Sequence, residues 1–135
     1  GSVAGEKALL ILPDTFMNKS GKALEAVKPL LRQGSGGQAK NLIVIHDDSD
    51  LLLGSVKISF GKNSAGHKGV ESVMRAVKSK DFWRIRIGIQ RKKRVDAMKL
   101  VLQKFTTAER LIVKKVEKKI IEALEKPLAV TTISV

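Results

Sequence analysis

One run of the sequence has side chains suited to acid–base or metal chemistry, His46-Asp47-Asp48-Ser49-Asp50. Its three carboxylates could hold a magnesium ion for phosphoryl chemistry. Alternatively, one aspartate could orient a histidine that acts as a general base, and the chain has only two histidines, His46 and His67. A solvated acidic turn is a third interpretation and a commoner one than a metal site. The sequence alone leaves all three open.

A second group of residues could bind phosphate or a substrate amide. Residues 61–69 form a polar, glycine-rich loop before a predicted helix, although the spacing of a Walker motif is missing. Arg84 and Arg86 fall on one face of a predicted strand and precede the basic run at residues 91–94. These cations predict a compact phosphate-binding patch, with a solvated face as the alternative. Asn18 could hydrogen-bond a substrate amide or a base edge, or could simply cap a turn.

The elements that must position these residues follow from hydrophobic periodicity. Apolar or alternating runs predict strands at residues 8–12, 42–45, 55–60 and 83–89. Helical spacing predicts a first helix from a Ser20 N-cap to about residue 31, with Pro29 near its end. Two further helices are predicted over residues 70–77 and 95–103. The last helix is predicted from the capping box Thr106-Thr-Ala-Glu109 to about residue 125. Strands alternating with helices indicate an α/β fold in one domain, with ligands at the carboxyl ends of strands.

Three smaller expectations complete the predicted architecture. The buried stripe of the last helix is expected to comprise Leu111, Ile112, Val116, Ile120 and Leu124. Residues 34–37 predict a flexible glycine-rich loop, and residues 128–135 predict a strand or a tail.

Composition limits the class of protein. The 135 residues include no cysteine, which excludes disulfide scaffolds, zinc ribbons, iron–sulfur sites and thiol nucleophiles, and favours a reducing, cytoplasm-like compartment. No apolar run approaches the roughly 20 residues of a membrane span. Lys plus Arg number 26 against 13 for Asp plus Glu, and residues 78–135 hold 16 basic and 6 acidic side chains. This excess favours a polyanionic partner such as nucleic acid, while the scarcity of aromatic residues argues against a base-stacking platform.

Four stretches of the sequence are distinctive both in their residues and in their order along the chain. They are residues 12–23 (LPDTFMNKSGKA), 43–51 (IVIHDDSDL) with Gly54, 64–72 (SAGHKGVES) and 81–89 (DFWRIRIGI). Residues 101–105 (VLQKF), followed by an acid-capped helix, fit the same pattern. From about residue 7 to about residue 124, the chain resembles the bacterial-type peptidyl-tRNA hydrolases.

This resemblance implies a three-layer, mixed β-sheet flanked by helices and an activity that needs no metal or cofactor. That activity is hydrolysis of the ester between a peptide and the terminal ribose of tRNA, in which a histidine oriented by an aspartate activates water. By motif, Asp47 matches the aspartate that pairs with the catalytic histidine, and Asn18 matches the substrate-positioning asparagine. Both are expected to be catalytic.

The resemblance also implies a tRNA-binding surface. Arg86 matches the basic residue that grips the tRNA 5′-phosphate, and Gly66 and His67 belong to a mobile loop over the cleft. The expected substrate- and tRNA-binding residues are Phe16, Met17, Asn18, Gly66, His67, Lys68 and Arg86.

The chain departs from the family's pattern at three places. Lys68 stands where the family has an asparagine, and because an ammonium group cannot accept a hydrogen bond, water would be positioned differently. Ser59 stands where a basic partner of Arg86 is usual. The family's first strand, its Gly-Asn-Pro-Gly turn and the segment with the catalytic histidine have no counterpart here, and neither histidine of the chain occupies that position. A single domain over residues 1–135, N-terminally incomplete, is therefore expected.

The sequence predicts a cytoplasmic peptidyl-tRNA hydrolase domain that acts on tRNA without membrane or cofactor, although catalysis by these residues alone is in question. A non-catalytic RNA-binding protein on the same fold is the alternative. Lys68 favours that alternative, whereas Asn18 and Asp47 favour the hydrolase. A missing first strand would expose a sheet edge, through which copies of the chain could form a homo-oligomer.

Overall fold

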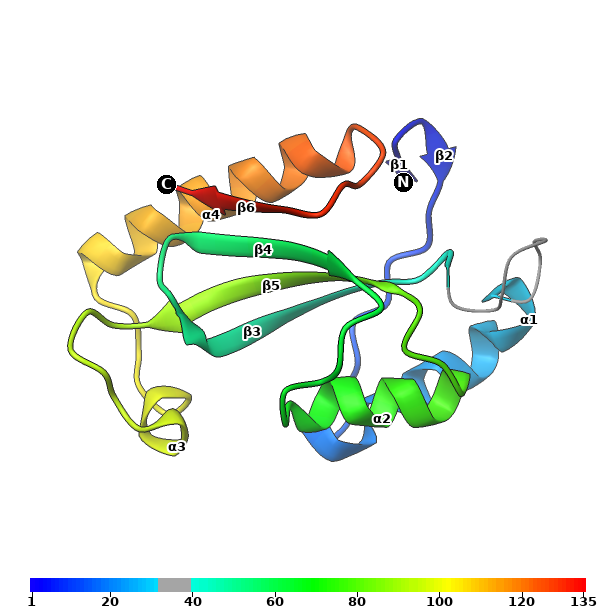
Figure 1. Ribbon diagram of the computed structural model, residues 1–135, viewed down its shortest axis with the longest axis horizontal. Coiled ribbons are helices and arrows are strands. Elements are labelled where there is room, and N and C mark those ends of the chain that lie inside the picture. The colour runs from blue at the N-terminus through cyan, green and yellow to red at the C-terminus, as the bar shows by residue number, and fades with distance from the viewer. Residues whose placement is uncertain (32–39) are drawn as a thin grey trace. The chain divides into compact units, whose positions relative to one another are not determined.

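The computed structural model describes residues 1–31 and 40–135, which form two compact units. Unit 1 comprises residues 1–2, 7–44 and 60–83, and unit 2 comprises residues 3–6, 45–59 and 84–135. Strands and helices are interspersed along the chain (Figure 1), which confirms the α/β class. The single domain over the whole chain stays a prediction, and the loop predicted at residues 34–37 lies outside the described residues.

The strands are β1 (Ser2–Val3), β2 (Glu6–Lys7), β3 (Ile43–Leu52), β4 (Ser55–Phe60), β5 (Trp83–Gln90) and β6 (Thr131–Ser134). The helices are the 3-10 helix η1 (Met17–Val27) and the α-helices α1 (Lys28–Leu31), α2 (Lys68–Val77), α3 (Ala97–Leu100) and α4 (Thr107–Leu124). β1 pairs with β2, and the other strands form one sheet in the order β3-β5-β4-β6. The strands expected at residues 55–60 and 83–89 and the helices expected at 70–77 and 106–125 are confirmed.

The core of unit 1 lies between η1, α1 and α2. Leu24 of η1, Leu31 of α1 and Phe82 before β5 contribute buried side chains to it. Three more, at positions three and four residues apart, come from α2: Val70, Val73 and Val77. η1 and α2 approach so closely that an ideal Cβ at Gly21 would meet the Ser72 carbonyl. The Gly21 N–H donates to Ser72 Oγ at 2.9 Å, so glycine is required for this contact.

The apolar run at residues 8–12 is not a strand, contrary to the prediction. It lies in irregular backbone, Leu9, Leu10 and Leu12 are exposed, and only Ile11 packs against the unit 1 core. A strand needs a neighbour for its N–H and C=O groups, and none of the strands in the described part of the chain pairs with this run. Apolar composition alone therefore does not produce a strand here.

The first helix also begins differently from the prediction. η1 starts at Met17, and Ser20 lies within it and donates its hydroxyl to the Met17 carbonyl at 2.8 Å instead of capping the helix. Pro29 is the second residue of α1, which follows η1 without a break. It therefore lies where the 3-10 helix changes to an α-helical turn, late in this helical stretch.

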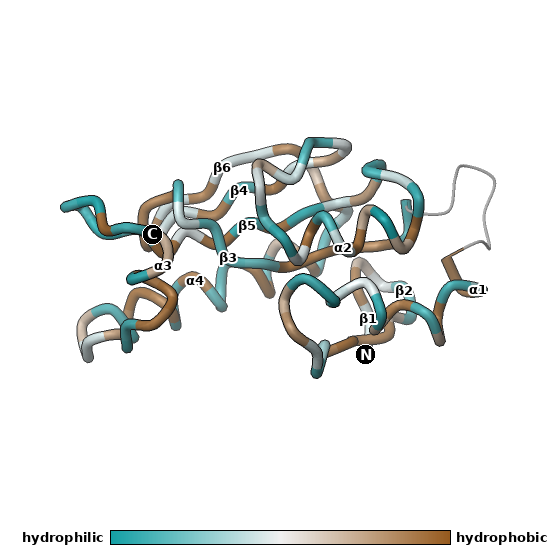
Figure 2. Tube along the Cα trace, turned by 90° about the horizontal axis from the view of Figure 1, so that it is seen from below, coloured by the Kyte–Doolittle hydropathy of each residue, from teal (hydrophilic) through white to brown (hydrophobic). Residues whose placement is uncertain are grey.

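The four-stranded sheet and α4 form most of unit 2. β6 pairs antiparallel with β4, from Ser55 opposite Ser134 to Ile58 opposite Thr131, so the C-terminal segment is an edge strand. α4 lies along the sheet (Figure 1), and hydrophobic and hydrophilic residues alternate along it (Figure 2). Val116 and Ile120 are its buried residues.

Two expectations for unit 2 are wrong in detail. Leu111 is exposed and does not belong to the buried stripe of α4. The helix expected over residues 95–103 is reduced to α3, which begins after Asp96, whose side chain accepts the Met98 N–H at 3.0 Å. Only Leu100 of α3 is buried, so little packing supports a longer helix.

Gly88 lies in β5 at a point where β3 leaves no room for a side chain. An ideal Cβ there would meet the Leu52 carbonyl, a backbone atom that cannot turn aside. The closeness of these strands therefore depends on glycine.

We expect Gly88→Ala to lower the free energy of unfolding by about 2 kcal/mol, because overpacked sites cost about 1–3 kcal/mol. Urea titration measures the change. Gly1→Ala is the control, since a Cβ at Gly1 would meet nothing within 4 Å. A loss from Gly88→Ala no larger than that from Gly1→Ala would contradict the tight approach.

Candidate functional site

The acidic run is part of a strand and not a turn, contrary to one interpretation of the sequence. β3 continues from Ile43 to Leu52, so residues 46–50 lie within it, in unit 2. Asp47 and Asp48 are both half-buried. Because successive strand residues point to opposite faces, Asp48 and Asp50 share one face, and Asp47 lies on the other.

Asp48 forms an ion pair with Arg86 of β5. Arg86 Nε and Nη2 lie 2.8 and 2.6 Å from Asp48 Oδ2, and the two side chains are only 20% and 11% exposed. The other carboxylate oxygen, Oδ1, accepts the backbone N–H of Asp50 at 2.8 Å. Arg86, the residue expected to bind the tRNA 5′-phosphate, is therefore paired with Asp48, whose other carboxylate oxygen accepts a backbone hydrogen bond.

Asp50 forms a second, exposed pair, with Arg94 Nη2 at 2.7 Å from its Oδ1. Two of the three carboxylates are thus counter-ions of arginines. Within residues 1–31 and 40–135, no group of three histidine, cysteine, aspartate or glutamate side chains could hold a metal ion. The arrangement does not support the magnesium interpretation.

Arg84 precedes Arg86 by two residues and lies on the same face of β5. It is only 3% exposed, and burial is the main cause that lowers its pKa. The charge of Arg86 lowers that pKa further, whereas the carboxylate of Asp48 raises it. Asp48 therefore offsets the repulsion between two neighbouring arginines.

Arg91, which the sequence places in a basic patch with Arg84, Arg86 and residues 92–94, forms an ion pair with Glu109. Its Nε and Nη2 donate to the two carboxylate oxygens of Glu109 at 2.9 and 3.3 Å, and Nη1 donates to Gln103 Oε1. Lys92, Lys93 and Arg94 are exposed. Arg91 instead ties the end of β5 to the start of α4.

Gln90 is a structural residue that the sequence analysis missed. It is buried, and its amide Nε2 donates to the Ser49 and Val95 carbonyls at 2.9 and 3.0 Å. Its Oε1 accepts the backbone N–H groups of Arg91 and Val95, each at 3.0 Å. The only sequence signal is an uncharged polar residue at the end of an alternating strand.

His67 is the N-cap of α2. Its Nδ1 accepts the Val70 N–H at 3.2 Å, so in the neutral ring the proton is on Nε2, which is a donor and not a base. In His46, Nδ1 lies 2.7 Å from the Asp47 carbonyl, which can only accept, and Nε2 is buried. Neither ring presents an unprotonated nitrogen to solvent in this arrangement.

The expected binding residues of unit 1 gather at the start of α2. An ideal Cβ at Gly69 would lie 2.5 Å from Met17 Sδ and 3.0 Å from His67 Cε1, so Met17 and His67 meet there. Asn18 is the exposed residue next to Met17. Phe16, Gly66 and Lys68 are exposed as well.

The structure thus gathers the predicted site residues in two groups. Asp47 and Arg86 belong to unit 2, and the others, Phe16, Met17, Asn18, Gly66, His67 and Lys68, belong to unit 1. Ser59, where the family carries a basic residue, is buried in β4.

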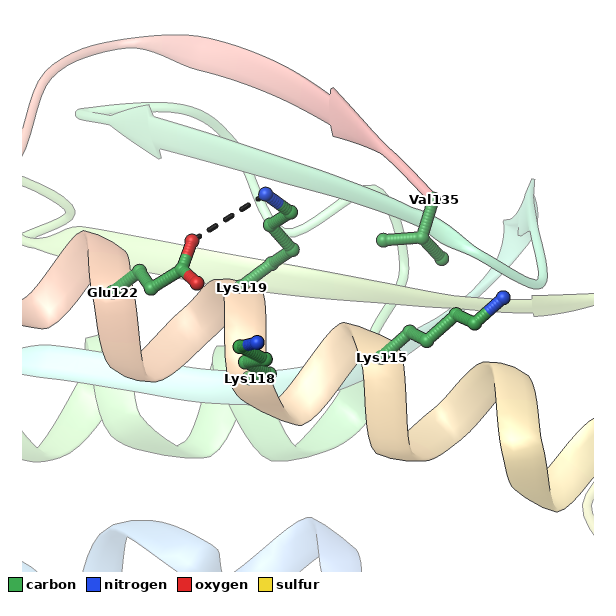
Figure 3. Close-up of a pocket in the computed structure, with 5 residues that line it drawn as sticks. All are labelled: Lys115, Lys118, Lys119, Glu122 and Val135. Carbon is green, nitrogen blue, oxygen red and sulfur yellow. Dashed lines mark hydrogen bonds and ion pairs between the residues drawn. The ribbon is translucent and has the colours of Figure 1, made fainter.

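A further basic surface lies on α4, beside the end of β6. Figure 3 shows the five residues that line a pocket there: Lys115, Lys118, Lys119, Glu122 and Val135. Lys119 Nζ lies 3.4 Å from Glu122 Oε2, and both side chains are exposed. Such an exposed pair contributes little to stability.

The start of α4 is a capping box, as predicted. Thr106 Oγ1 accepts the Glu109 N–H at 3.2 Å, and Glu109 Oε2 accepts the Thr106 N–H at 2.9 Å. The hydrogen bond from Arg91 is the main cause that lowers the pKa of Glu109, and the bond from the Thr106 backbone lowers it further. A lowered carboxyl pKa stabilises the fold above the unfolded value, and this contribution disappears as the pH falls through the folded pKa.

We expect Glu109→Gln to lower the free energy of unfolding at pH 7 by about 1 kcal/mol, and the difference from wild type to shrink below about pH 4. Chemical denaturation at both pH values checks this. Glu122→Gln, which removes the same charge from an exposed pair on the same helix, should change stability by less than about 0.5 kcal/mol. An effect of Glu109→Gln that is equal at both pH values would refute the ionic contribution.

Comparison with known proteins gives the family. The family model described as peptidyl-tRNA hydrolase matches residues 1–133. The peptidyl-tRNA hydrolase of Thermodesulfovibrio yellowstonii is 42% identical over 118 residues, which cover 86% of this chain and 59% of that protein. The one from Mycobacterium tuberculosis is 43% identical over 111 residues, which cover 82% and 56%. The chain therefore spans somewhat more than half of these curated relatives.

Solved structures agree on the fold. A crystal structure of peptidyl-tRNA hydrolase from Acinetobacter baumannii matches with a TM-score of 0.68 at 22% identity, over 97% of this chain and 71% of that one. A mutant of that protein matches with a TM-score of 0.74 at 23% identity, over 93% and 64%. The predicted mixed sheet flanked by helices is confirmed by these likenesses. On the family match and the identities above, the chain belongs to the peptidyl-tRNA hydrolase family.

Proposed function

We propose that the protein to which this chain belongs hydrolyses peptidyl-tRNA, releasing the peptide from the terminal ribose of tRNA. The observation that carries the proposal is the family match over residues 1–133, at 42% identity to a named peptidyl-tRNA hydrolase. Among residues 1–31 and 40–135, no helix is long and apolar enough to cross a membrane. We place the activity in the cytoplasm, where its tRNA substrate occurs.

In this proposal each group of site residues has a separate task. In unit 2, Arg86 binds the 5′-phosphate of tRNA, and the exposed Lys92 and Lys93 add sequence-independent attraction to the RNA backbone. Asp47 orients a histidine that acts as general base. In unit 1, Asn18 positions the substrate beside Met17 and the His67 loop.

The base itself is not expected among the two histidines of this chain. Because Nδ1 accepts the Val70 N–H, the neutral His67 ring carries its proton on Nε2, and the Nε2 of His46 is buried. His67 is suited to donate a hydrogen bond to a substrate carbonyl, and Lys68 can do the same. Peptide recognition and base catalysis are therefore separate functions in this proposal.

We expect an N-blocked peptidyl-tRNA to bind this chain about tenfold more tightly than the same tRNA without the peptide, as one good hydrogen bond to the substrate provides. Asn18→Ala should remove this difference and leave the affinity for deacylated tRNA unchanged. Fluorescence anisotropy with both tRNAs measures it. Equal affinities in the wild type would favour the non-catalytic RNA-binding alternative, which Lys68 also favours.

The same tRNAs show whether a histidine of the chain is the base. Because neither ring is arranged as a base, we expect the wild-type chain to hydrolyse the ester no faster than it hydrolyses without protein, and His46→Ala and His67→Asn to leave that rate unchanged. Asparagine is chosen at position 67 because it can retain the cap. A turnover that either substitution abolishes in a folded variant would identify a relocated base.

We also propose that copies of the chain associate through a sheet edge. β3 and β6 are the edge strands of the four-stranded sheet, and unpaired edges invite pairing with another chain. Sedimentation equilibrium should then give a mass above 14.7 kDa that rises with concentration. A monomeric mass at all concentrations would exclude this association.

A further inference from the structure

Ser72 of α2 is a buried polar residue to which the proposed function assigns no task. It is 8% exposed, and its Oγ accepts the backbone N–H of Gly21 at 2.9 Å. This hydrogen bond joins residues that lie 51 positions apart in the sequence. η1 and α2 both belong to unit 1 and lie side by side (Figure 1). The Ser72 hydroxyl therefore forms a directional contact between the two helices.

The same contact fixes how closely the helices approach. An ideal Cβ at Gly21 would meet the Ser72 carbonyl and would lie 2.9 Å from Ala76 Cβ. The backbone of η1 therefore packs directly on α2. A buried N–H that loses its acceptor is costly, so without the Ser72 hydroxyl the Gly21 N–H would have to turn toward water. That movement would shift η1 along α2.

Asn18 lies on the face of η1 that carries this contact. In a 3-10 helix, residues three positions apart lie on the same side, so Asn18, Gly21 and Leu24 share one face. Gly21 and Leu24 are the buried residues of η1, and Asn18 is exposed one turn before them. A shift of η1 at Gly21 therefore moves Asn18 as well.

The contacts within the turn around Asn18 do not determine where the turn lies on α2. The Lys19 N–H donates to the Phe16 carbonyl, and Ser20 Oγ donates to the Met17 carbonyl, each at 2.8 Å. These hydrogen bonds span three residues, so they define the shape of the turn only. Its position against α2 must come from contacts between the helices.

Two described contacts join the start of η1 to α2. Met17 Sδ packs at Gly69, but it is the end of a flexible side chain that adapts to its surroundings. The hydrogen bond from Gly21 to Ser72 involves the backbone and is directional. Ser72 therefore has the greater control over the position of Asn18 relative to His67, the N-cap of α2.

We propose that Ser72 is a positioning residue for peptide recognition. By binding the Gly21 N–H, it sets the position of Asn18 at the start of α2, so that the chain distinguishes peptidyl-tRNA from deacylated tRNA. The buried hydroxyl acts through Asn18 and does not contact the substrate. This inference rests on the proposed function and deepens it.

The test uses an N-blocked peptidyl-tRNA and the same tRNA without the peptide, with fluorescence anisotropy to measure both dissociation constants. The wild type should bind the peptidyl form about tenfold more tightly, and Ser72→Ala should reduce this ratio to about twofold or less. Its affinity for deacylated tRNA should stay within about twofold of the wild type, because the proposed phosphate-binding residues belong to unit 2.

Ser59→Ala is the matched control. Ser59 is 7% exposed, so the same hydroxyl is removed from an equally buried serine. Within residues 1–31 and 40–135, Ser59 Oγ has no hydrogen-bond partner, and Ser59 lies in unit 2. This variant should keep the tenfold ratio.

A double variant distinguishes positioning from a general loss of structure. If Ser72 acts through Asn18, adding Ser72→Ala to Asn18→Ala should reduce the ratio no further than Asn18→Ala alone. A role of Ser72 in folding only would lower the stability of Ser72→Ala and leave the ratio between the two tRNAs at the wild-type value. Urea titration measures the stability.

A second variant covers the case in which Ser72→Ala does not fold. Ser72→Cys keeps a side chain of similar size but replaces the hydroxyl by a weak acceptor, so it should also reduce the ratio to about twofold. Circular dichroism establishes folding. If neither variant folds, Ser72 serves the fold alone and the positioning role is overturned.

The outcomes separate the two proposals. A wild type that binds neither tRNA, or binds both equally, overturns peptidyl-tRNA recognition and with it the role of Ser72. A tenfold ratio that survives Ser72→Ala, or Ser72→Cys in its place, leaves the proposed function standing and overturns the role of Ser72. An equal loss of the ratio in Ser59→Ala also overturns that role.

Discussion

Charge compensation is the constraint on which unit 2 depends. The chain carries a formal charge of +13, yet the side chains of Arg86 and Arg91 are only 20% and 31% exposed. Each has a carboxylate within hydrogen-bond distance, Asp48 for Arg86 and Glu109 for Arg91. Leaving such a cation half-buried and unpaired would cost more than the pair contributes. The carboxylates of β3 and α4 thus determine where the arginines of β5 and its loop can lie.

Pairing with carboxylates distinguishes the basic residues that are held in place from those that are exposed. Arg91 is bound bidentately to Glu109, which in turn caps α4, so one arginine joins a strand end, a loop and a helix start. Arg86 is paired with the half-buried Asp48. The lysines of the loop and of α4 are exposed and supply attraction without orientation. A strongly basic composition therefore contains few groups that can position a phosphate.

In unit 1, residues expected to bind the substrate also have structural contacts. The His67 ring caps α2 through Nδ1, and this contact determines which nitrogen carries the proton. Met17 packs at Gly69, so the turn with Asn18 is joined to the His67 loop by packing. Met17 and His67, which the family resemblance assigns to substrate binding, thereby meet at the start of α2.

The sequence by itself determined the α/β class, β4, β5, α2 and the capping box of α4, because these depend on local periodicity and on contacts within a few residues. Its motifs also determined the family. Only the tertiary structure decided that residues 8–12 are not a strand, that Leu111 is exposed, and that the acidic run continues β3. It alone decided that Asp48 and Glu109 pair with Arg86 and Arg91, 38 and 18 residues away in the sequence. Strand pairing and charge compensation join distant residues, and composition and periodicity carry no information about which partner comes near.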